Sequence, residues 1–201
     1  MRRSIPRRPP DPFRQFAAWF AAASRSRAVT YPNVMCLSTV DLRGRPDARI
    51  VLLKGFDQRG FVFYGNVHST KGKSLLAFPQ AALTLYWEPL KRQVRIQGRT
   101  ELVSEEEADA YFRTRPRLSQ LAAWASPQSA PLPSRAVLER RFAAMQKRFR
   151  GQRVSRPPFW VGFRVIPSAI EFWQERPNRL HDRFVFRKDR RQRWSVMRLA
   201  P

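Results

Sequence analysis

A series of short segments rich in β-branched and aromatic residues fills the chain between residues 34 and 103. These segments cover residues 34–40, 49–54, 61–64, 81–87 and 94–103. Turn-forming residues separate several of them, at 41–44, 57–60 and 88–89. Because the connections are so short, neighbouring strands are expected to pair antiparallel. The sequence therefore predicts a curled sheet or a barrel, completed by later strands over residues 160–165, 170–174, 184–187 and 194–199.

Helical segments interrupt the strands and are marked by capping residues. Asp11, with Pro12 behind it, opens the first helix, and Ser69 opens the second. Ser104 and Glu107 form a capping-box pattern at the third. The predicted helices cover residues 11–27, 69–78, 104–113 and 134–149, the last with an apolar stripe of Val137, Leu138, Phe142 and Met145. We expect a fold that is mainly β with peripheral helices, as one domain over residues 11–201 after a basic, disordered arm at residues 1–10.

The composition excludes several classes of protein. Cys36 is the only cysteine, which rules out an intrachain disulfide and a cysteine-rich metal site. His68 and His181 are the only histidines, so we expect no metal site. No apolar stretch approaches the ~20 residues that cross a bilayer, which predicts no membrane partner and a cytoplasmic location. The formal net charge of +24 favours anionic ligands, but the arginines are scattered and carry little functional information by themselves.

The stretch from Ile170 to Arg183 is the most informative one for function. It reads Ile-Glu-Phe-Trp-Gln and then, after a short interval, Arg-Leu-His-Asp-Arg. If the second part is extended, Arg179, His181 and Arg183 share one face, because strand side chains alternate. Two cations beside an imidazole would attract an anionic ligand and disfavour protonation of the imidazole. The alternative is a solvated basic edge strand, and spacing alone does not decide between the two.

Two further segments offer phosphate-binding groups. Arg49 and Lys54 lie at the ends of a strand expected to be buried, and their odd offset places them on opposite sides. Thr70 and Lys71 lie at a helix start, where free backbone N–H groups and an ammonium group can hold a phosphate. Each signal is weak alone, since such cations are more often solvated strand ends or ordinary caps. Groups suited to a heteroaromatic ring come from Gln93, Gln128 and Ser129, while Trp173 is by default a core or interface residue.

The C-terminal stretch resembles the signature of the pyridoxamine 5′-phosphate oxidase family. Glu171-Phe-Trp-Gln174 followed by Arg179-Leu-His-Asp-Arg183 carries the likeness, which extends over residues 11–201. Other matching stretches, in the same order, are residues 49–56, 61–64, 87–88, 92–94, 111–112, 115–120, 123–126 and 198–201. The resemblance implies an FMN-binding split β-barrel that acts as a homodimer, with each flavin at the subunit interface.

Carried over position by position, the resemblance also implies the site residues. FMN contacts fall on Arg49, Ile50, Val51, Leu52, Leu53, Lys54, Tyr64, Gly65, Thr70, Lys71, Gln93, Gln128, Ser129, Trp173 and Arg183. Substrate contacts fall on Lys54, Tyr111, Arg115, Ser119, Arg179 and His181, and the last two are implied to be catalytic because they hold the pyridine ring over the flavin.

The reaction implied by the resemblance oxidises pyridoxamine 5′-phosphate or pyridoxine 5′-phosphate to pyridoxal 5′-phosphate. Hydride passes from the substrate C4′ to flavin N5, and dioxygen reoxidises the flavin to give hydrogen peroxide. No protein nucleophile takes part, which agrees with the absence of P-loop, Gly-x-Ser-x-Gly and dinucleotide-binding motifs from the sequence.

The chain departs from the family pattern at three positions. Tyr31 stands where an acidic residue is common, Thr70 where arginine is usual beside Lys71, and Gly65 where threonine or serine is usual. These changes, with the short segment before Asp11, predict weaker retention of FMN or substrate rather than another fold. Two alternatives stay open: a split-barrel flavoprotein with a different reductase or binding role, and, ranked third, a basic nucleic-acid-binding module, for which the sequence has no reading motif.

Overall fold

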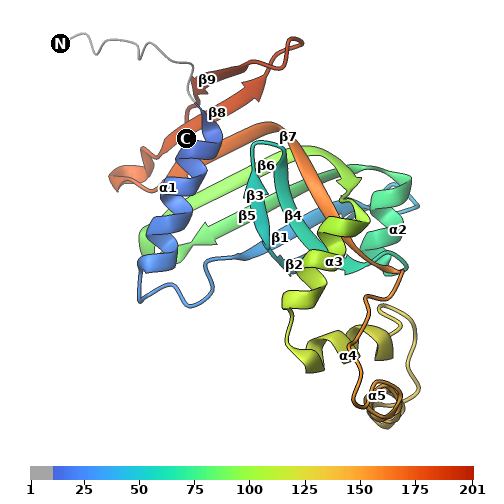
Figure 1. Cartoon of the computed structure of the whole chain (residues 1–201). Coiled ribbons are helices and arrows are strands. Elements are labelled where there is room, and N and C mark those ends of the chain that lie inside the picture. The colour runs from blue at the N-terminus through green and yellow to red at the C-terminus, as the bar shows by residue number, and fades with distance from the viewer. Residues whose placement is uncertain (1–10) are drawn as a thin grey trace, which may run out of the picture.

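The computed structural model describes residues 11–201, so the arm predicted over residues 1–10 lies outside the described part, and the division into arm and single domain stays a prediction. A strongly curled antiparallel sheet forms the body of the molecule, with helices around it (Figure 1). Its strands are β1 (Val34–Val40), β2 (Pro46–Leu52), β3 (Gly55–Asp57), β4 (Gly60–Asn66), β5 (Gln80–Trp87), β6 (Arg92–Leu102), β7 (Trp160–Gln174), β8 (Asp182–Lys188) and β9 (Trp194–Arg198). The predicted fold class is confirmed.

Strand β7 organises the sheet. The strands follow the order β2-β1-β5-β6-β7-β4-β3, and β8 pairs with both β7 and β9. β7 pairs with β6 along nearly its whole length, with β4 over residues 160–165 and with β8 over residues 169–174. All strand pairs within the described residues are antiparallel, as predicted from the short connections.

The two strands predicted at residues 160–165 and 170–174 are one continuous strand, so the separation was wrong. The register shifts opposite Gln97 and Gly98, which leaves Ser168 without a partner in the ladder. The Ser168 hydroxyl donates to the Gln97 carbonyl oxygen at 3.1 Å. A bulge of this kind accommodates Pro167, which has no N–H to donate, without ending the strand.

The helices are α1 (Pro12–Arg25), α2 (Thr70–Ala77), α3 (Glu105–Thr114), α4 (Arg117–Ala125) and α5 (Arg135–Arg148), with short 3-10 turns at Glu88–Leu90 and Pro177–Arg179. The predicted N-caps are confirmed, since the side chains of Asp11, Ser69 and Ser104 each accept a backbone N–H of the first turn. α4 was not predicted, because Pro116 precedes it and offers no side-chain cap. Within residues 11–201, no helix is long and apolar enough to span a membrane.

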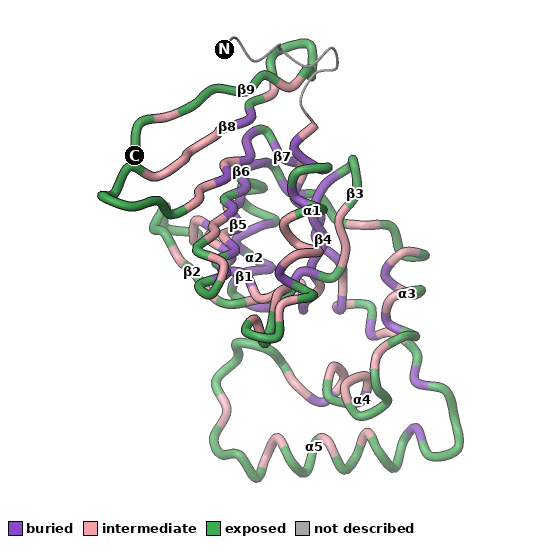
Figure 2. Tube along the Cα trace, turned by 90° about the vertical axis from the view of Figure 1, so that its left-hand side faces the viewer, coloured by how far each residue is buried: buried purple, intermediate pink, exposed green. Residues whose placement is uncertain are grey.

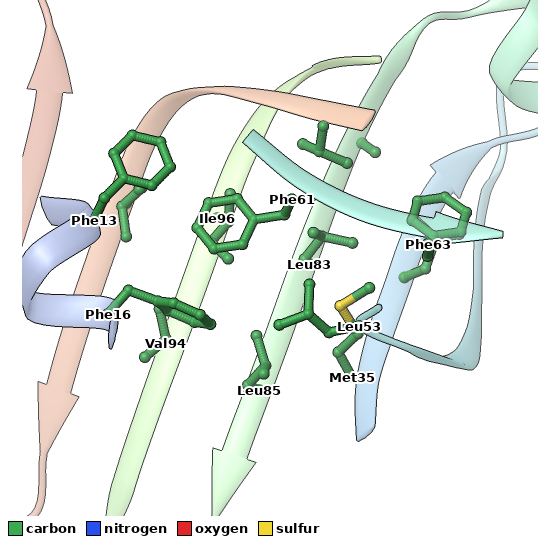
Figure 3. Packing of buried hydrophobic residues seen from close by; sticks show 14 of the residues in the cluster. Phe13, Phe16, Met35, Leu53, Phe61, Phe63, Leu83, Leu85, Val94 and Ile96 are labelled. Atoms are coloured by element: carbon green, nitrogen blue, oxygen red, sulfur yellow. The ribbon is translucent and has the colours of Figure 1, made fainter. Parts of the chain in front are cut away.

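The main hydrophobic core fills the inside of the sheet, and α1 packs against it with aromatic side chains (Figure 3). Phe16 meets Phe61 of β4 edge to face, with ring centroids 4.8 Å apart, and Phe13 stacks on the same ring at 5.6 Å. Such aromatic pairs contribute about 0.5–1.5 kcal/mol each beyond the area that they bury. The aromatic face of α1 therefore accounts for its position on the sheet.

A smaller apolar cluster lies among α3, α4 and α5. Its buried members are Phe112, Leu121, Phe149, Val154 and Trp160. Phe142 and Met145, from the stripe predicted for the last helix, pack against this cluster, although no residue of α5 is fully buried (Figure 2). The cluster packs α3 and α4 against the start of β7. These three elements together form one wall of the site described next.

Candidate functional site

A cavity of about 910 Å³ opens beside the edge strand β2. The end of β4 and the first turn of α2 contribute to one side of it, and residues of α3, α4 and the loop after α4 contribute to the other. Its volume lies within the range of small-molecule and cofactor sites, about 300–1,000 Å³. The predicted site residues that line it are Arg49, Ile50, Val51, Leu52, Lys54, Tyr64, Gly65, Thr70, Lys71, Tyr111, Arg115, Ser119, Gln128 and Ser129.

Lys71, in the first turn of α2, is a buried cation in this cavity. Its side chain is only 9% exposed, and its ammonium group donates to Ser69 Oγ at 3.1 Å and to Gln128 Oε1 at 2.7 Å. Burial, together with the positive charge of Arg49, lowers the pKa of Lys71 to about 8. Both hydrogen-bond partners are neutral oxygens, so the charge of Lys71 is available to an anionic ligand.

Gly65 makes room for this lysine. A Cβ atom at residue 65 would lie 2.8 Å from Lys71 Cε and 3.2 Å from Nζ. A threonine or serine, which the family resemblance favours at this position, would therefore displace the Lys71 side chain from where it lies. Arg49 is held from its own sheet, by Thr39 Oγ1 at 2.7 Å and by the carboxylate of Asp47.

Three aromatic rings stand nearly parallel in the cavity wall. The ring of Tyr64 lies within 10° of that of Tyr111, with centroids 4.2 Å apart, and within 5° of that of Trp160, at 5.0 Å. Gly162 lies opposite Tyr64 in the β4–β7 register, and a Cβ atom there would come within 2.7 Å of the tyrosine ring. Burial raises the pKa of Tyr64 to about 12, so its hydroxyl stays protonated and can donate a hydrogen bond.

Arg115 follows the last turn of α3. Like Lys71, it is a cation of the cavity with an N–H group that has no hydrogen-bond partner among residues 11–201. Its Nη1 is buried without a hydrogen-bond partner, and burial lowers its pKa. A buried donor left unpaired costs about 1–3 kcal/mol, which a ligand oxygen at this point would recover. Lys54, Tyr111 and Ser119 line the same cavity, and together these side chains supply the donors that a phosphomonoester needs.

The placement predicted for Arg49 and Lys54, on opposite sides of a buried strand, is wrong. β2 is an edge strand, with Ile50 64% exposed, and it ends at Leu52. The alternation of side chains does not continue past the end of the strand, so Arg49 and Lys54 line the same cavity. The side chain of Leu53, an implied FMN contact, lies in the main core rather than in the cavity.

The other predicted residues form a second group, away from the cavity. Gln93 of β6 lies opposite Trp173 of β7, and Trp173 lies opposite Arg183 of β8. The His181 ring packs on Trp173, with centroids 4.7 Å apart. None of these residues, nor Arg179, lines the cavity, and β8 lies at the end of the molecule remote from α4 and α5 (Figure 1).

The segment 179–183 is not extended throughout. Arg179 is exposed, closes a 3-10 turn and has a φ of 60°, and β8 begins only at Asp182. His181 Nδ1 accepts the Arg176 backbone N–H at 3.1 Å, and Arg183 pairs with Glu171 at 2.8 Å. The shared strand face of three residues therefore does not form, although His181 and Arg183 both flank Trp173.

The cavity also contains residues that the sequence did not single out for the site. These include Asp47, Asn66, Thr114, Ser126 and Trp160. Asn66 ends β4, and its backbone N–H donates to Gln128 Oε1 at 3.3 Å, which helps to place that amide beside Lys71. Trp160 begins β7, and no spacing signal in the sequence links it to α3.

A split barrel with a cation-rich cavity beside its edge strand is the class of protein that this fold and site define. The family model described as pyridoxamine 5′-phosphate oxidase matches residues 23–149. A second, described as the C-terminal dimerisation region of pyridoxine 5′-phosphate oxidase, matches residues 160–201. The chain belongs to the pyridoxamine 5′-phosphate oxidase family.

Individual relatives agree with this assignment. A pyridoxine/pyridoxamine 5′-phosphate oxidase from Rubrobacter xylanophilus is 55% identical over 192 residues, covering 96% of this chain and 88% of the relative. One from Azorhizobium caulinodans is 54% identical over 192 residues, covering 95% and 90%. Among solved structures, PhzG from Burkholderia lata, in complex with tetrahydrophenazine-1-carboxylic acid, superposes with a TM-score of 0.89 at 29% identity, covering 99% of this chain and 98% of that one.

Proposed function

We propose that this protein is an FMN-dependent oxidase that converts pyridoxamine 5′-phosphate or pyridoxine 5′-phosphate to pyridoxal 5′-phosphate. One observation carries the proposal: a single cavity holds two sets of phosphate-binding side chains, one around Lys71 and one around Arg115. Such an oxidase binds two phosphomonoesters together, the cofactor and the substrate, and charge-assisted hydrogen bonds are the strongest means of holding each. The names of the relatives support the same reaction.

The residues around Lys71 fit FMN. Lys71 and Arg49 supply positive charge for the phosphate, and Gln128 and Ser129 supply neutral polar groups at the same side of the cavity. Gly65 leaves the space that the Lys71 side chain occupies. When bound, FMN supplies the hydride acceptor, and dioxygen restores it.

The residues around Arg115 fit the substrate phosphate. The guanidinium of Arg115, the ammonium of Lys54 and the hydroxyls of Tyr111 and Ser119 line one cavity and are all hydrogen-bond donors. Their task is to hold the substrate by its phosphate so that the carbon to be oxidised is placed reproducibly. No side chain here has to act as a nucleophile.

We infer that each complete site combines two protomers of a homodimer. The cavity lies beside edge strand β2, whose Ile50 and Leu52 are exposed, and the C-terminal stretch matches a dimerisation region. The second group, which includes Arg179 and His181, would then reach the cavity of the other protomer. Because His181 Nδ1 accepts the Arg176 N–H, a neutral His181 carries its proton on Nε2 and can donate it to the substrate.

A test of the function compares substrates in the purified protein with saturating FMN. Pyridoxamine 5′-phosphate should be consumed with formation of pyridoxal 5′-phosphate and an equal amount of hydrogen peroxide. A flavin spectrum without turnover of either phosphorylated vitamer would reject the oxidase and favour a split-barrel flavoprotein of another role, such as one acting on a tricyclic acid of the kind seen with PhzG.

The change Thr70→Arg is expected to tighten FMN binding. Thr70 is exposed, lines the cavity and lies next to Lys71, so an arginine there would add a third cation, beside Lys71 and Arg49, near the phosphate. We expect the FMN dissociation constant to fall by about three- to tenfold, measured by quenching of flavin fluorescence. Leu76→Arg, on the exposed face of the same helix and outside the cavity, is the control for added charge. Equal tightening in both variants would contradict the assignment.

FMN affinity is expected to fall as the pH rises through about 8. Lys71 has a depressed pKa of about 8 in the free protein, and the phosphate dianion favours its charged form, so FMN binding takes up a proton above this pH. The dissociation constant should be about tenfold larger at pH 9 than at pH 7. In Lys71→Met the same titration should give weaker binding at both pH values and little change between them. A pH dependence that survives in this variant would place the titrating group elsewhere.

A further inference from the structure

Arg115, which is half-buried, is supported differently from two arginines whose side chains are buried. Arg156 and Arg164, whose side chains are 8% and 3% exposed, each contact two carboxylates. Arg115 makes no ion pair within residues 11–201, and its Nη1 has no hydrogen-bond partner there. Its guanidinium carbon instead lies 4.7 Å from the centre of the Trp160 ring and 5.5 Å from that of Phe112.

Trp160 is held firmly enough to act as this support. Its side chain is 7% exposed and packs edge-on against Phe112, with centroids 5.0 Å apart, and parallel to Tyr64. Its backbone is anchored at both polar atoms: the N–H donates to the Pro157 carbonyl oxygen at 2.9 Å, and its carbonyl oxygen accepts from Arg156 Nη1 at 2.9 Å. Tyr64 and Phe112 therefore hold the ring beside Arg115.

An aromatic ring beside an arginine affects the guanidinium differently from a carboxylate. A carboxylate would occupy N–H groups of the guanidinium and neutralise its charge. The face of an indole ring attracts the guanidinium while leaving the N–H groups at its edge unoccupied. The positive charge of Arg115 is thus not neutralised by a carboxylate of the described residues, its Nη1 lacks a partner, and the residue lines the cavity in which a ligand would bind.

We propose that Trp160 is a positioning residue that holds Arg115, through the face of its ring, for the phosphate group of the substrate. This inference rests on the proposed function, since that function makes Arg115 a substrate contact. It assigns Trp160 a task beyond packing in the cluster around Phe112 and Phe149. The residue would set how strongly the site prefers phosphorylated over unphosphorylated ligands.

The test measures that preference directly. The ligands are 4′-deoxypyridoxine 5′-phosphate and 4′-deoxypyridoxine, which lack the group that is oxidised, and their dissociation constants are measured by calorimetry on the FMN-loaded protein. Trp160→Leu is expected to reduce the preference for the phosphorylated ligand by about tenfold. Trp160→Phe keeps a smaller ring face, so its preference for the phosphorylated ligand is expected to fall only about two- to threefold. If the leucine variant does not fold, this variant provides the test.

Two controls separate positioning from packing. Phe149→Leu truncates another buried aromatic residue of the same cluster and should leave the preference unchanged. Among residues 11–201, the cation–π contacts of Arg115 are with Phe112 and Trp160 and not with Phe149. In the background of Arg115→Met, Trp160→Leu should have no further effect on the preference. An unchanged preference in Trp160→Leu, or an equal loss with and without Arg115, would overturn the proposal. Lack of turnover by the wild-type protein would reject the oxidase, while the measured preference would still decide the role of Trp160.

Discussion

Mixing two inactive variants of this protein is expected to restore activity. Arg115→Met removes a cavity residue, and Arg179→Met removes a residue of the second group. Each variant alone should lose about 100-fold in kcat/KM, because an arginine bound to a charged ligand contributes about 1.5–3 kcal/mol per hydrogen bond. In a mixed dimer, one site receives both changes and the other receives neither, if every site combines the cavity of one protomer with the second group of the other.

An equal mixture should therefore recover about one quarter of the wild-type activity, since about half of the dimers are mixed and each has one intact site. Co-expression of the two variants with different tags, followed by purification on both, would raise the recovery to about one half. Arg115→Met combined with Lys54→Met is the matched control, because both residues belong to the cavity and no dimer regains an intact site. Recovery in the control, or none in the first pair, would show that the two groups do not meet across protomers.

The elements of the fold were predictable where the signal is local. The caps at Asp11, Ser69 and Ser104 act within one helical turn, and their hydrogen bonds are those expected from the sequence. α4 lacks such a signal because Pro116 offers no side-chain acceptor. The continuity of β7 past Pro167 depends on a bulge, which is a property of two paired strands and cannot be read from one of them.

Many of the residues expected at the site line one cavity, but their arrangement could not be read from the sequence. Alternation placed Arg49 and Lys54 apart, yet the strand ends before Lys54 and both reach one cavity. Gly65 is expected from the resemblance to weaken retention of FMN or substrate, and this stays a prediction. Nothing in the sequence indicates that the missing Cβ atom leaves room for the Lys71 side chain. Arg115 follows the end of α3, and Trp160 begins β7, 45 residues later in the chain. Their contact depends on how α3 packs against β7, which the sequence does not show.

The change Glu107→Leu is expected to cost about 3 kcal/mol of unfolding free energy. Glu107 lies on α3, and both of its carboxylate oxygens accept from Arg164 Nη2 at 2.7 Å. Arg164 is 3% exposed, so removal of this partner leaves a buried guanidinium with Asp57, at 3.3 Å, as its other carboxylate. The midpoint of thermal unfolding should fall by about 6–12 °C, measured by circular dichroism.

The double variant Glu107→Leu/Arg164→Leu tests why the single variant loses unfolding free energy. The cause is either the buried charge of Arg164 without its Glu107 partner or a loss of packing around residue 107. Without the guanidinium of Arg164, no buried positive charge is left without its partner. Replacement of both members of a buried ion pair by apolar residues often leaves the stability unchanged. We therefore expect the double variant to regain most of the stability that the single variant loses. A double variant as unstable as the single one would mean that the destabilisation comes from the leucine at residue 107, and not from the loss of the Glu107 partner of Arg164.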